Sequence, residues 1–214
     1  MPRELRRPAV LGMAAALLLL AGCQTGRQDA ATVEQLQAAR DPRIAVQIPV
    51  TCTDVSDVCA RAYAEHAAAC LNLVEAADTA TRAAMRSCAQ QDFRQSLAHS
   101  PPGSDRLVAT RGLAEATRIA RDNGNDYART ALELDGLSAQ LGAMPGGTPY
   151  AAYYAADNEL SRVLTRAVPA EQACSTLTDA EAKLLPAGAA GDLSRNLTTL
   201  RSNLAAAMKN RGCA

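Results

Sequence analysis

The sequence predicts an all-α protein of about seven helices, and three observations lead to this fold class. Apolar and small residues recur at helical spacing through most of the chain after Cys52. Clusters of proline and glycine, such as "HSPPGSD" at 99–105 and "MPGGTP" at 144–149, divide this region into pieces of helix length. Trp is absent, Phe occurs once and Tyr five times. The core must therefore consist mainly of Ala, Leu and Val, which suits helices that approach one another closely.

The helices are expected in order along the chain. A hairpin follows Cys52 and turns in "AADTAT" at 76–81, with Asp78 or Thr79 capping its second helix. Ser104 or Asp105 caps the next helix, which runs to a left-handed residue at Asn123-Gly124, and a partner spans about 125–141. Thr148 caps a further helix that ends near 168–169. Residues 169–185 form one helix or two short ones, because 178–181 fits a capping box. The last helix carries a leucine seam up to Gly212.

The segment before Cys52 differs from the helical region. Residues 25–31 are polar and are expected to form a tether. Apolar residues alternate in "RIAVQIPVT" at 43–51, but Pro49 interrupts the pattern and no second strand is found to pair with it. We therefore expect an extended segment lying on the helices, with an edge strand as the alternative.

The first residues have the layout of an export signal. Three arginines, the last of them Arg7, precede an apolar run over 9–21, which is too short to cross about 30 Å of hydrocarbon. The run ends in Leu20-Ala21-Gly22-Cys23. These residues resemble the lipobox of bacterial lipoproteins. The resemblance implies cleavage before Cys23 and acylation of this cysteine, and two or three acyl chains hold a protein firmly on a membrane.

The lipoprotein resemblance also implies a location and a division of the chain. Gln24 is not the aspartate that retains enteric lipoproteins at the inner membrane, so the expected address is the outer membrane, facing the periplasm. The chain then divides into a signal peptide at 1–22, a lipidated tether and extended segment at 23–51, and a disulfide-bonded helical domain at 52–214.

Cysteine usage agrees with export. Acylation of Cys23 leaves six of the seven cysteines, an even number that predicts three disulfides in an oxidising compartment. On one continuous helix Cys70 and Cys88 would lie about 27 Å apart, whereas the hairpin about Thr79 brings them side by side. The expected pairs are Cys52 with Cys59, Cys70 with Cys88, and Cys174 with Cys213.

Several side chains are candidates for binding or chemistry. Cys59, His66 and Cys70 share a helical stripe and could hold zinc or copper with Cys88 or Cys52 as a fourth ligand, but disulfides are the favoured interpretation and no metal is expected. Three tyrosines form a second candidate: Tyr150, Tyr153 and Tyr154. They either make an aromatic patch that binds a peptide or a sugar, or they are core residues. A row of alternating charges predicts a solvated helix face: Arg111, Glu115, Arg118 and Asp122.

The helix pairs begin near 54, 104, 149 and 191, and this spacing favours either a short helical-repeat array or an irregular bundle. The small-residue pairing weakly resembles tetratricopeptide proteins, although the tryptophan and Leu-Gly spacing of that repeat are absent. The signal peptide removes three arginines and one glutamate from 22 basic and 22 acidic side chains, which leaves a net charge of about −2 and favours neither nucleic acid nor anionic lipid as a partner.

No serine elbow, Ser-x-x-Lys, His-Glu-x-x-His or Cys-x-x-Cys motif occurs, so the commonest hydrolase, metalloprotease and thioredoxin-type activities are not predicted. We expect a non-catalytic envelope scaffold without a cofactor, held on the membrane by its lipid and binding a periplasmic or outer-membrane protein. The first alternative is a periplasmic metal-binding or redox protein that uses Cys59, His66 and Cys70. The second is a cell-wall or lipid-modifying enzyme with a site near 150–157.

Overall fold

The computed structural model describes residues 28–74, 78–124 and 126–213, and over these ranges it is all-α, as the sequence predicts. Seven helices follow the N-terminal region: α3 (Asp57–Val74), α4 (Thr79–His99), α5 (Leu107–Asn123), α6 (Tyr127–Gly142), α7 (Thr148–Leu164), α8 (Ala173–Lys183) and α9 (Ser194–Arg211). Three short 3-10 helices complete the C-terminal part, at Ala170–Gln172, Pro186–Ala189 and Gly191–Leu193. The described ranges contain no β-strand.

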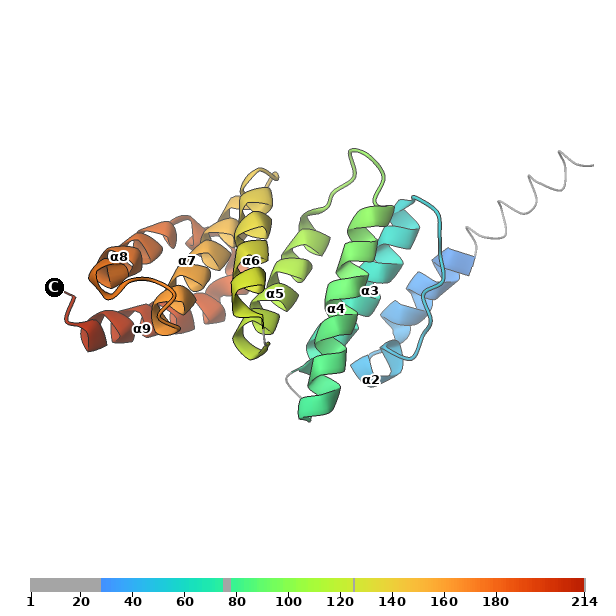
Figure 1. Cartoon of the computed structure of the whole chain (residues 1–214). Coiled ribbons are helices and arrows are strands. Elements are labelled where there is room, and N and C mark those ends of the chain that lie inside the picture. The colour runs from blue at the N-terminus through green and yellow to red at the C-terminus, as the bar shows by residue number, and fades with distance from the viewer. Residues whose placement is uncertain (1–27, 75–77, 125, 214) are drawn as a thin grey trace, which may run out of the picture.

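The seven helices form a layered array in which neighbours in sequence are neighbours in space. Each helix from α3 to α9 packs against the next, and the odd-numbered helices also contact one another in succession, α3 with α5, α5 with α7 and α7 with α9. Figure 1 shows the resulting elongated molecule, with α3 and α4 toward one end and α8 and α9 at the other. The odd-numbered helices thus form a continuous row, which is the feature that places the candidate site.

The α3–α4 hairpin forms where the sequence predicts it. The Asp78 carboxylate accepts hydrogen bonds from the backbone N–H groups of Ala80 and Thr81, both at 3.0 Å, and so caps α4. Helices α3 and α4 pack against each other with Cys70 opposite Cys88. These two cysteines are equally far from Thr79 in sequence, so other residues equally far from Thr79 on the two helices also face each other.

One apolar core runs through α3 to α9 and is rich in alanine and leucine, as the composition predicts. Helices approach closely where small residues permit it. A Cβ atom added at Gly112 of α5 would lie 2.2 Å from the Phe93 ring of α4. Glycine at this position therefore lets the tip of the Phe93 ring approach the backbone of α5 closely.

The segment before Cys52 is more helical than the sequence predicts. Residues 28–38 are helical, so the expected polar tether is helical from residue 28, and Ile44 lies in the short helix α2 (Pro42–Ala45). The alternation in 43–51 is misleading because the Asp41 carboxylate caps α2 and Pro42 occupies its first turn. Residues 46–51 are non-helical and carry apolar side chains that pack beside Cys52 and Cys59, so the expected packing of this segment on the helices is confirmed.

Several predicted helix ends differ from the structure. Thr148 is the first residue of α7 and does not cap it, and α7 ends at Leu164 instead of near 168–169. Gly124 ends α5 with φ −101°, an extended rather than a left-handed conformation. A Cβ atom here would lie 2.4 Å from the Ala120 carbonyl oxygen, so contact distance rather than handedness requires glycine. Helix α8 continues through the expected capping box, because the Thr178 hydroxyl donates back to the Cys174 carbonyl at 3.0 Å instead of capping a new helix. The last helix ends where the sequence predicts, and Gly212 follows α9 in the left-handed conformation, with φ +68°.

Candidate functional site

A groove of about 810 Å³ lies on the row of odd-numbered helices. Its long wall is a stripe on α3 made of Ala60, Ala64, Ala68 and Leu71, which recur at helical spacing and therefore share one face. The opposite wall is the N-terminal half of α5, with Val108 and Gly112. Further lining residues come from α4, α7, α9 and the turns beside them: Phe93, Ser96, Ser100, Tyr154, Leu193 and Asn196. Charged side chains line the groove as well, among them Arg61 and Glu65 on α3 and Arg111 and Glu115 on α5.

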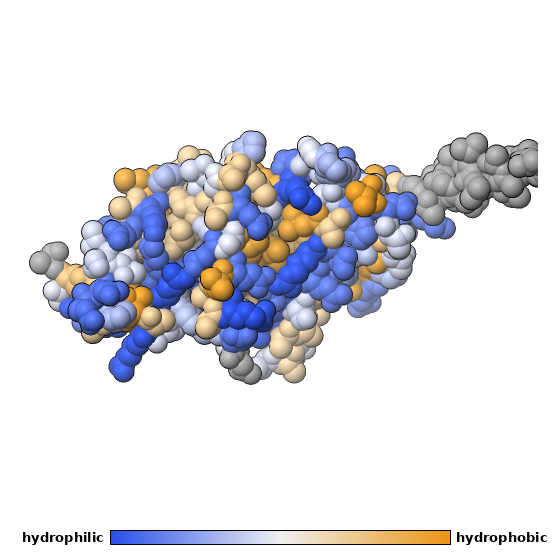
Figure 2. Space-filling view, turned by 45° about the horizontal axis from the view of Figure 1, so that its top comes forward, coloured by the Kyte–Doolittle hydropathy of each residue, from blue (hydrophilic) through white to orange (hydrophobic). Residues whose placement is uncertain are grey.

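The groove is apolar in its floor and acidic at the end where α3 and α5 begin. Asp57 and Asp105 line this end and are exposed, and neither forms an ion pair with another described residue. Val108 beside them is 60% exposed. On the face seen in Figure 2, apolar side chains are likewise concentrated in a hollow near the middle of the molecule and are bordered by hydrophilic ones. An exposed apolar surface with a polar border is typical of a site that binds another molecule.

The other rim of the groove is held by an arginine that joins two helices. Arg111 donates to the Asp192 carboxylate at 2.6 Å and to the Tyr150 hydroxyl at 2.9 Å, and its guanidinium lies 4.9 Å from the centre of the Tyr150 ring. The Tyr150 hydroxyl in turn donates to Asp192 at 3.0 Å. Because all three side chains satisfy one another, this rim is rigid and close to neutral.

Of the three predicted tyrosines, two are core residues. Tyr153 and Tyr154 are 4% and 2% exposed, and their rings meet edge to face with 5.0 Å between centres. Burial raises the pKa of both phenols well above the usual range. Only Tyr150 reaches the surface, so the three do not form an aromatic patch, and the core interpretation is the one that the structure supports.

The row of charges on α5 is not the solvated face that its spacing predicts. Glu115 accepts two hydrogen bonds from Arg118, at 3.0 and 2.7 Å, in a half-buried position. Arg121, which the sequence analysis did not single out, is 3% exposed and donates to Asp122 on α5 and to Asp157 and Asn158 on α7. The row is partly covered because residues of α7, among them Tyr150 and Asp157, pack beside it. Helical spacing does not reveal this contact between distant segments.

Asp157 belongs to this buried network and is not an accessible acid. It accepts from Arg121 at 2.7 Å, and burial raises the pKa of its carboxyl although Arg121 opposes the shift. Asn158 donates to the Ala131 carbonyl and to Asp135 on α6, which ties the three helices together. Most residues in 150–157 therefore belong to the core or pack against it. The buried network gives no structural support to the enzymatic site that was suggested near these residues.

The cysteines pair as the sequence predicts: Cys52 with Cys59, Cys70 with Cys88, and Cys174 with Cys213, with Cα–Cα distances of 5.7, 6.0 and 5.4 Å. Cys23 and the residues that resemble a lipobox lie outside the described ranges. Among the described helices, none combines the length and the apolar character that a membrane span needs.

The predicted metal stripe is only partly assembled. Cys59 is bonded to Cys52 in the N-terminal cluster, away from His66, whereas His66 and Cys70 lie with Cys88 and Asp92 of α4. Asp92 is the residue that sequence reasoning missed. The sequence contains the information needed to find it. His66 and Asp92 are equally far from Thr79, as Cys70 and Cys88 are, so the hairpin that pairs the two cysteines must also bring His66 and Asp92 together.

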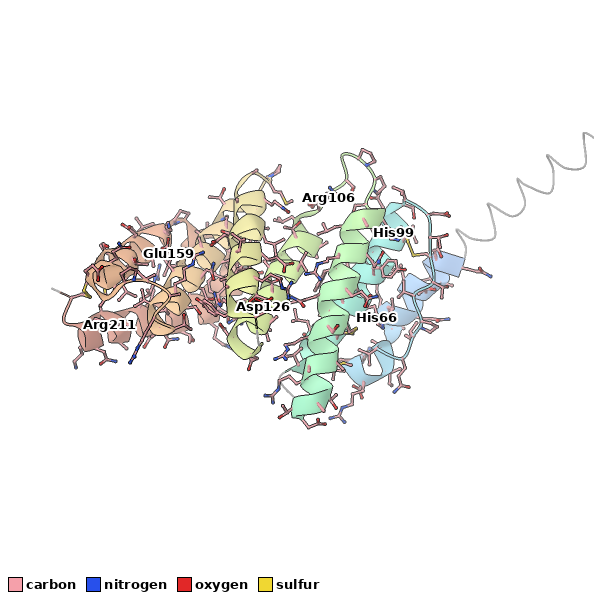
Figure 3. All side chains as sticks on the ribbon, viewed as in Figure 1. His66, His99, Arg106, Asp126, Glu159 and Arg211 are labelled. Atoms are coloured by element: carbon pink, nitrogen blue, oxygen red, sulfur yellow. A yellow bond between two sulfur atoms is a disulfide. The ribbon has the colours of Figure 1, made fainter. Side chains whose placement is uncertain are left out.

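His66 lies midway along the hairpin (Figure 3), and both nitrogens of its imidazole face acceptors. Nδ1 lies 2.6 Å from Asp92 Oδ2 and Nε2 lies 3.3 Å from the Val46 carbonyl oxygen. The hydrogen bond with Asp92 raises the pKa of His66 above its ordinary 6.5, burial acts in the opposite direction, and the Asp92 charge and the Val46 carbonyl add to the increase.

Comparison of the chain with protein-family models, with curated proteins and with solved structures found no match.

Proposed function

We propose that this chain is a lipoprotein anchored through Cys23 at the periplasmic face of the outer membrane, and that its helical array is a non-catalytic scaffold that binds a partner protein. The groove between α3 and α5 carries this proposal. Arrays of stacked helix pairs bind partners on the surface that one row of helices presents, and the groove lies on the row formed by α3, α5, α7 and α9.

The groove also indicates the chemistry of the partner. Its α3 wall is a stripe of alanines with Leu71, which would accept the apolar face of a helix or an extended segment. Its acidic end carries Asp57 and Asp105 without cationic partners among the described residues. We therefore propose a partner segment with an apolar face and with lysine or arginine at one end.

Three disulfides support the oxidising compartment, since such bonds persist in exported proteins and are rare in the cytosol. The anchor itself is tested by the intact mass of the protein extracted from membranes and by the Cys23→Ala variant. We expect acylated wild-type protein in the outer-membrane fraction, and a Cys23→Ala variant that is neither acylated nor cleaved before position 23 and is missing from that fraction. An unmodified Cys23 in membrane-extracted protein would contradict the anchor.

The groove is tested by photo-crosslinking in cells. A photoreactive residue at Val108, inside the groove, is compared with one at Leu132, which is 71% exposed on α6 and does not line the groove. We expect one protein to crosslink from position 108 and not from 132, through a peptide with apolar residues next to lysine or arginine. The double variant Asp57→Asn/Asp105→Asn should lower the yield, whereas Asp179→Asn on the exposed side of α8 should not.

Equal crosslinking from both positions, or capture of a segment without basic residues, would contradict the proposed groove. The amide variants keep the shape of the carboxylates and remove their charge, and the amide oxygen at position 105 can still accept from the Leu107 N–H. A loss of yield in folded variants therefore reports charge complementarity. Circular dichroism of each variant provides the check on folding.

A further inference from the structure

A second constellation lies within the α3–α4 hairpin and is independent of the groove. His66 and Cys70 on α3 and Cys88 and Asp92 on α4 each offer one ligand atom, and these four atoms lie within 4.8 Å of one another. The two helices present them as two opposed pairs, four residues apart on each helix, so all four point into the same space between α3 and α4.

We propose that the Cys70–Cys88 disulfide is the closed form of a zinc site, and that reduction of this bond opens it. The ligands would be two thiolates, the Nδ1 atom of His66 and a carboxylate oxygen of Asp92. Sulfur, imidazole nitrogen and carboxylate oxygen are the three ligand types that proteins use for Zn²⁺, which prefers four of them in a tetrahedron.

The distances from Cys88 Sγ suit such a tetrahedron, and the two sulfur atoms, which are bonded to each other here, separate on reduction. Zinc bonds of about 2.0–2.3 Å place neighbouring ligand atoms about 3.3–3.8 Å apart. Cys88 Sγ lies 3.6 Å from Asp92 Oδ2 and 3.9 Å from His66 Nδ1. Nδ1 and Oδ2 are closer, at 2.6 Å, because a hydrogen lies between them. Zn²⁺ would take the place of that hydrogen and separate the two atoms, a small movement for two side chains that are only partly buried.

The surroundings of His66 supply the outer support that metal-binding histidines have. Its other nitrogen, Nε2, lies 3.3 Å from the Val46 carbonyl oxygen and can donate to it while Nδ1 binds the metal. Such a hydrogen bond fixes the tautomer and the orientation of the ring. Val46 belongs to the segment that follows α2, so this segment would orient the ligand from outside the hairpin.

The opening step is a thiol–disulfide exchange with a dithiol reductant. One thiolate of the reductant attacks Cys88 Sγ, which is partly exposed, and Cys70 leaves as a thiolate; the second thiol of the reductant then displaces Cys88. The reductant ends as a disulfide, and its two electrons and two protons appear as two cysteine thiols. Zinc binding then releases the two thiol protons, together with the His66 proton where the ring is charged.

The test uses the purified full-length protein and Co²⁺ or Zn²⁺ alone as the probe. The protein is reduced with a phosphine under argon, freed of reductant and titrated. We expect one tetrahedral Co²⁺ spectrum with thiolate charge-transfer bands, displaced by Zn²⁺, and none in the oxidised protein. His66→Ala and Asp92→Asn should each weaken Zn²⁺ binding by about 100-fold or more, since even outer partners of a metal site are worth about 10- to 100-fold.

Matched variants exclude the other cysteines. Cys174→Ser/Cys213→Ser and Cys52→Ser/Cys59→Ser should keep the signal, and Cys70→Ser/Cys88→Ser should abolish it. The proposal is overturned if the reduced protein binds no Co²⁺, whether or not it keeps its helical circular dichroism, or if His66→Ala and Asp92→Asn bind as tightly as the wild type. Neither result would bear on partner binding in the groove, which is tested separately.

Discussion

Arg121 is a buried arginine, and each of the three nitrogens of its guanidinium donates to another side chain. It donates to Asp122, Asp157 and Asn158 at 2.7–2.9 Å, and Asn158 carries the network on to α6. Burying a charge is unfavourable unless it is paired and hydrogen-bonded. The network therefore contributes to a single arrangement of α5, α6 and α7, since any other packing of these helices would leave the charge without partners.

We predict that Arg121→Met destabilises the protein by about 3–5 kcal/mol, because it leaves Asp157 buried without its cation. Urea unfolding followed by circular dichroism measures the change. Arg129→Met is the matched control, since Arg129 pairs with Asp126 on an exposed surface of α6, and it should leave the unfolding midpoint unchanged within error. Equal effects of the two substitutions would show that the buried network is not important for stability.

The His66–Asp92 pair makes stability depend on pH while the Cys70–Cys88 bond is intact. The pKa of His66 is higher in the folded protein than the ordinary 6.5, because Asp92 accepts from its ring. The stabilisation by the charged ring is therefore fully present below pH 6.5 and is lost as pH rises through the folded pKa.

The measurement is the free energy of unfolding of the oxidised protein at several pH values from 6 upward. We expect the advantage of the wild type over Asp92→Asn to be largest at pH 6 and to shrink as pH rises. An advantage that is constant or that grows over this range would contradict a charged His66 in the folded state.

At the scale of elements, helix contacts in this protein depend on small residues. The core contains little aromatic surface, and the Phe93 ring finds room only because Gly112 faces it. Glycine costs a helix roughly 1 kcal/mol relative to alanine. Its presence in the middle of α5 is explained by the approach of α4 and not by any need for an unusual backbone conformation.

The pair Gly112→Ala and Gly136→Ala separates these two effects. At Gly112 the new methyl group would overlap the Phe93 ring, and we expect a loss of about 1–3 kcal/mol. At Gly136, inside α6, a Cβ atom meets nothing within 4 Å, and alanine should stabilise the protein by about 0.5–1 kcal/mol. Thermal unfolding of both variants checks the signs, and a stabilising Gly112→Ala would contradict the packing described for Phe93.

At the scale of the whole molecule, the array is fastened near both of its ends. Cys52–Cys59 secures the N-terminal segment on α3, and Cys174–Cys213 joins α8 to the end of α9. The array has open ends, because each helix packs mainly on its neighbours in sequence. Terminal helices have fewer partners than central ones and would separate first, so a covalent bond there opposes fraying.

We predict that Cys174→Ser/Cys213→Ser lowers stability by about 3–4 kcal/mol, because this bond closes a loop with a sequence separation of 39. Cys52→Ser/Cys59→Ser, with a separation of 7, should cost less, about 2–3 kcal/mol. Chemical unfolding under non-reducing conditions compares the two variants. The opposite order would mean that the N-terminal segment depends on its disulfide for more than loop closure.

The sequence reveals more of the cluster in the α3–α4 hairpin than of the groove. The hairpin about Thr79 and the Cys70–Cys88 pair follow from local rules, and the same symmetry would have located Asp92 opposite His66. The groove could not be found in this way. Its walls come from α3 and α5, with contributions from α7 and α9, and only packing shows that the stripe from Ala60 to Leu71 lines a groove.

The amino-acid order alone determined the all-α class, the positions of most helices and the three cysteine pairs, because helical spacing, capping and chain reversal act over a few residues. The tertiary structure decided which faces are buried. It placed Tyr153, Tyr154 and Arg121 in the interior, left one face of α3 open and turned part of a presumed extended segment into α2. Burial depends on which distant helices meet, and in an alanine-rich chain most faces are small and apolar enough to pack against several others.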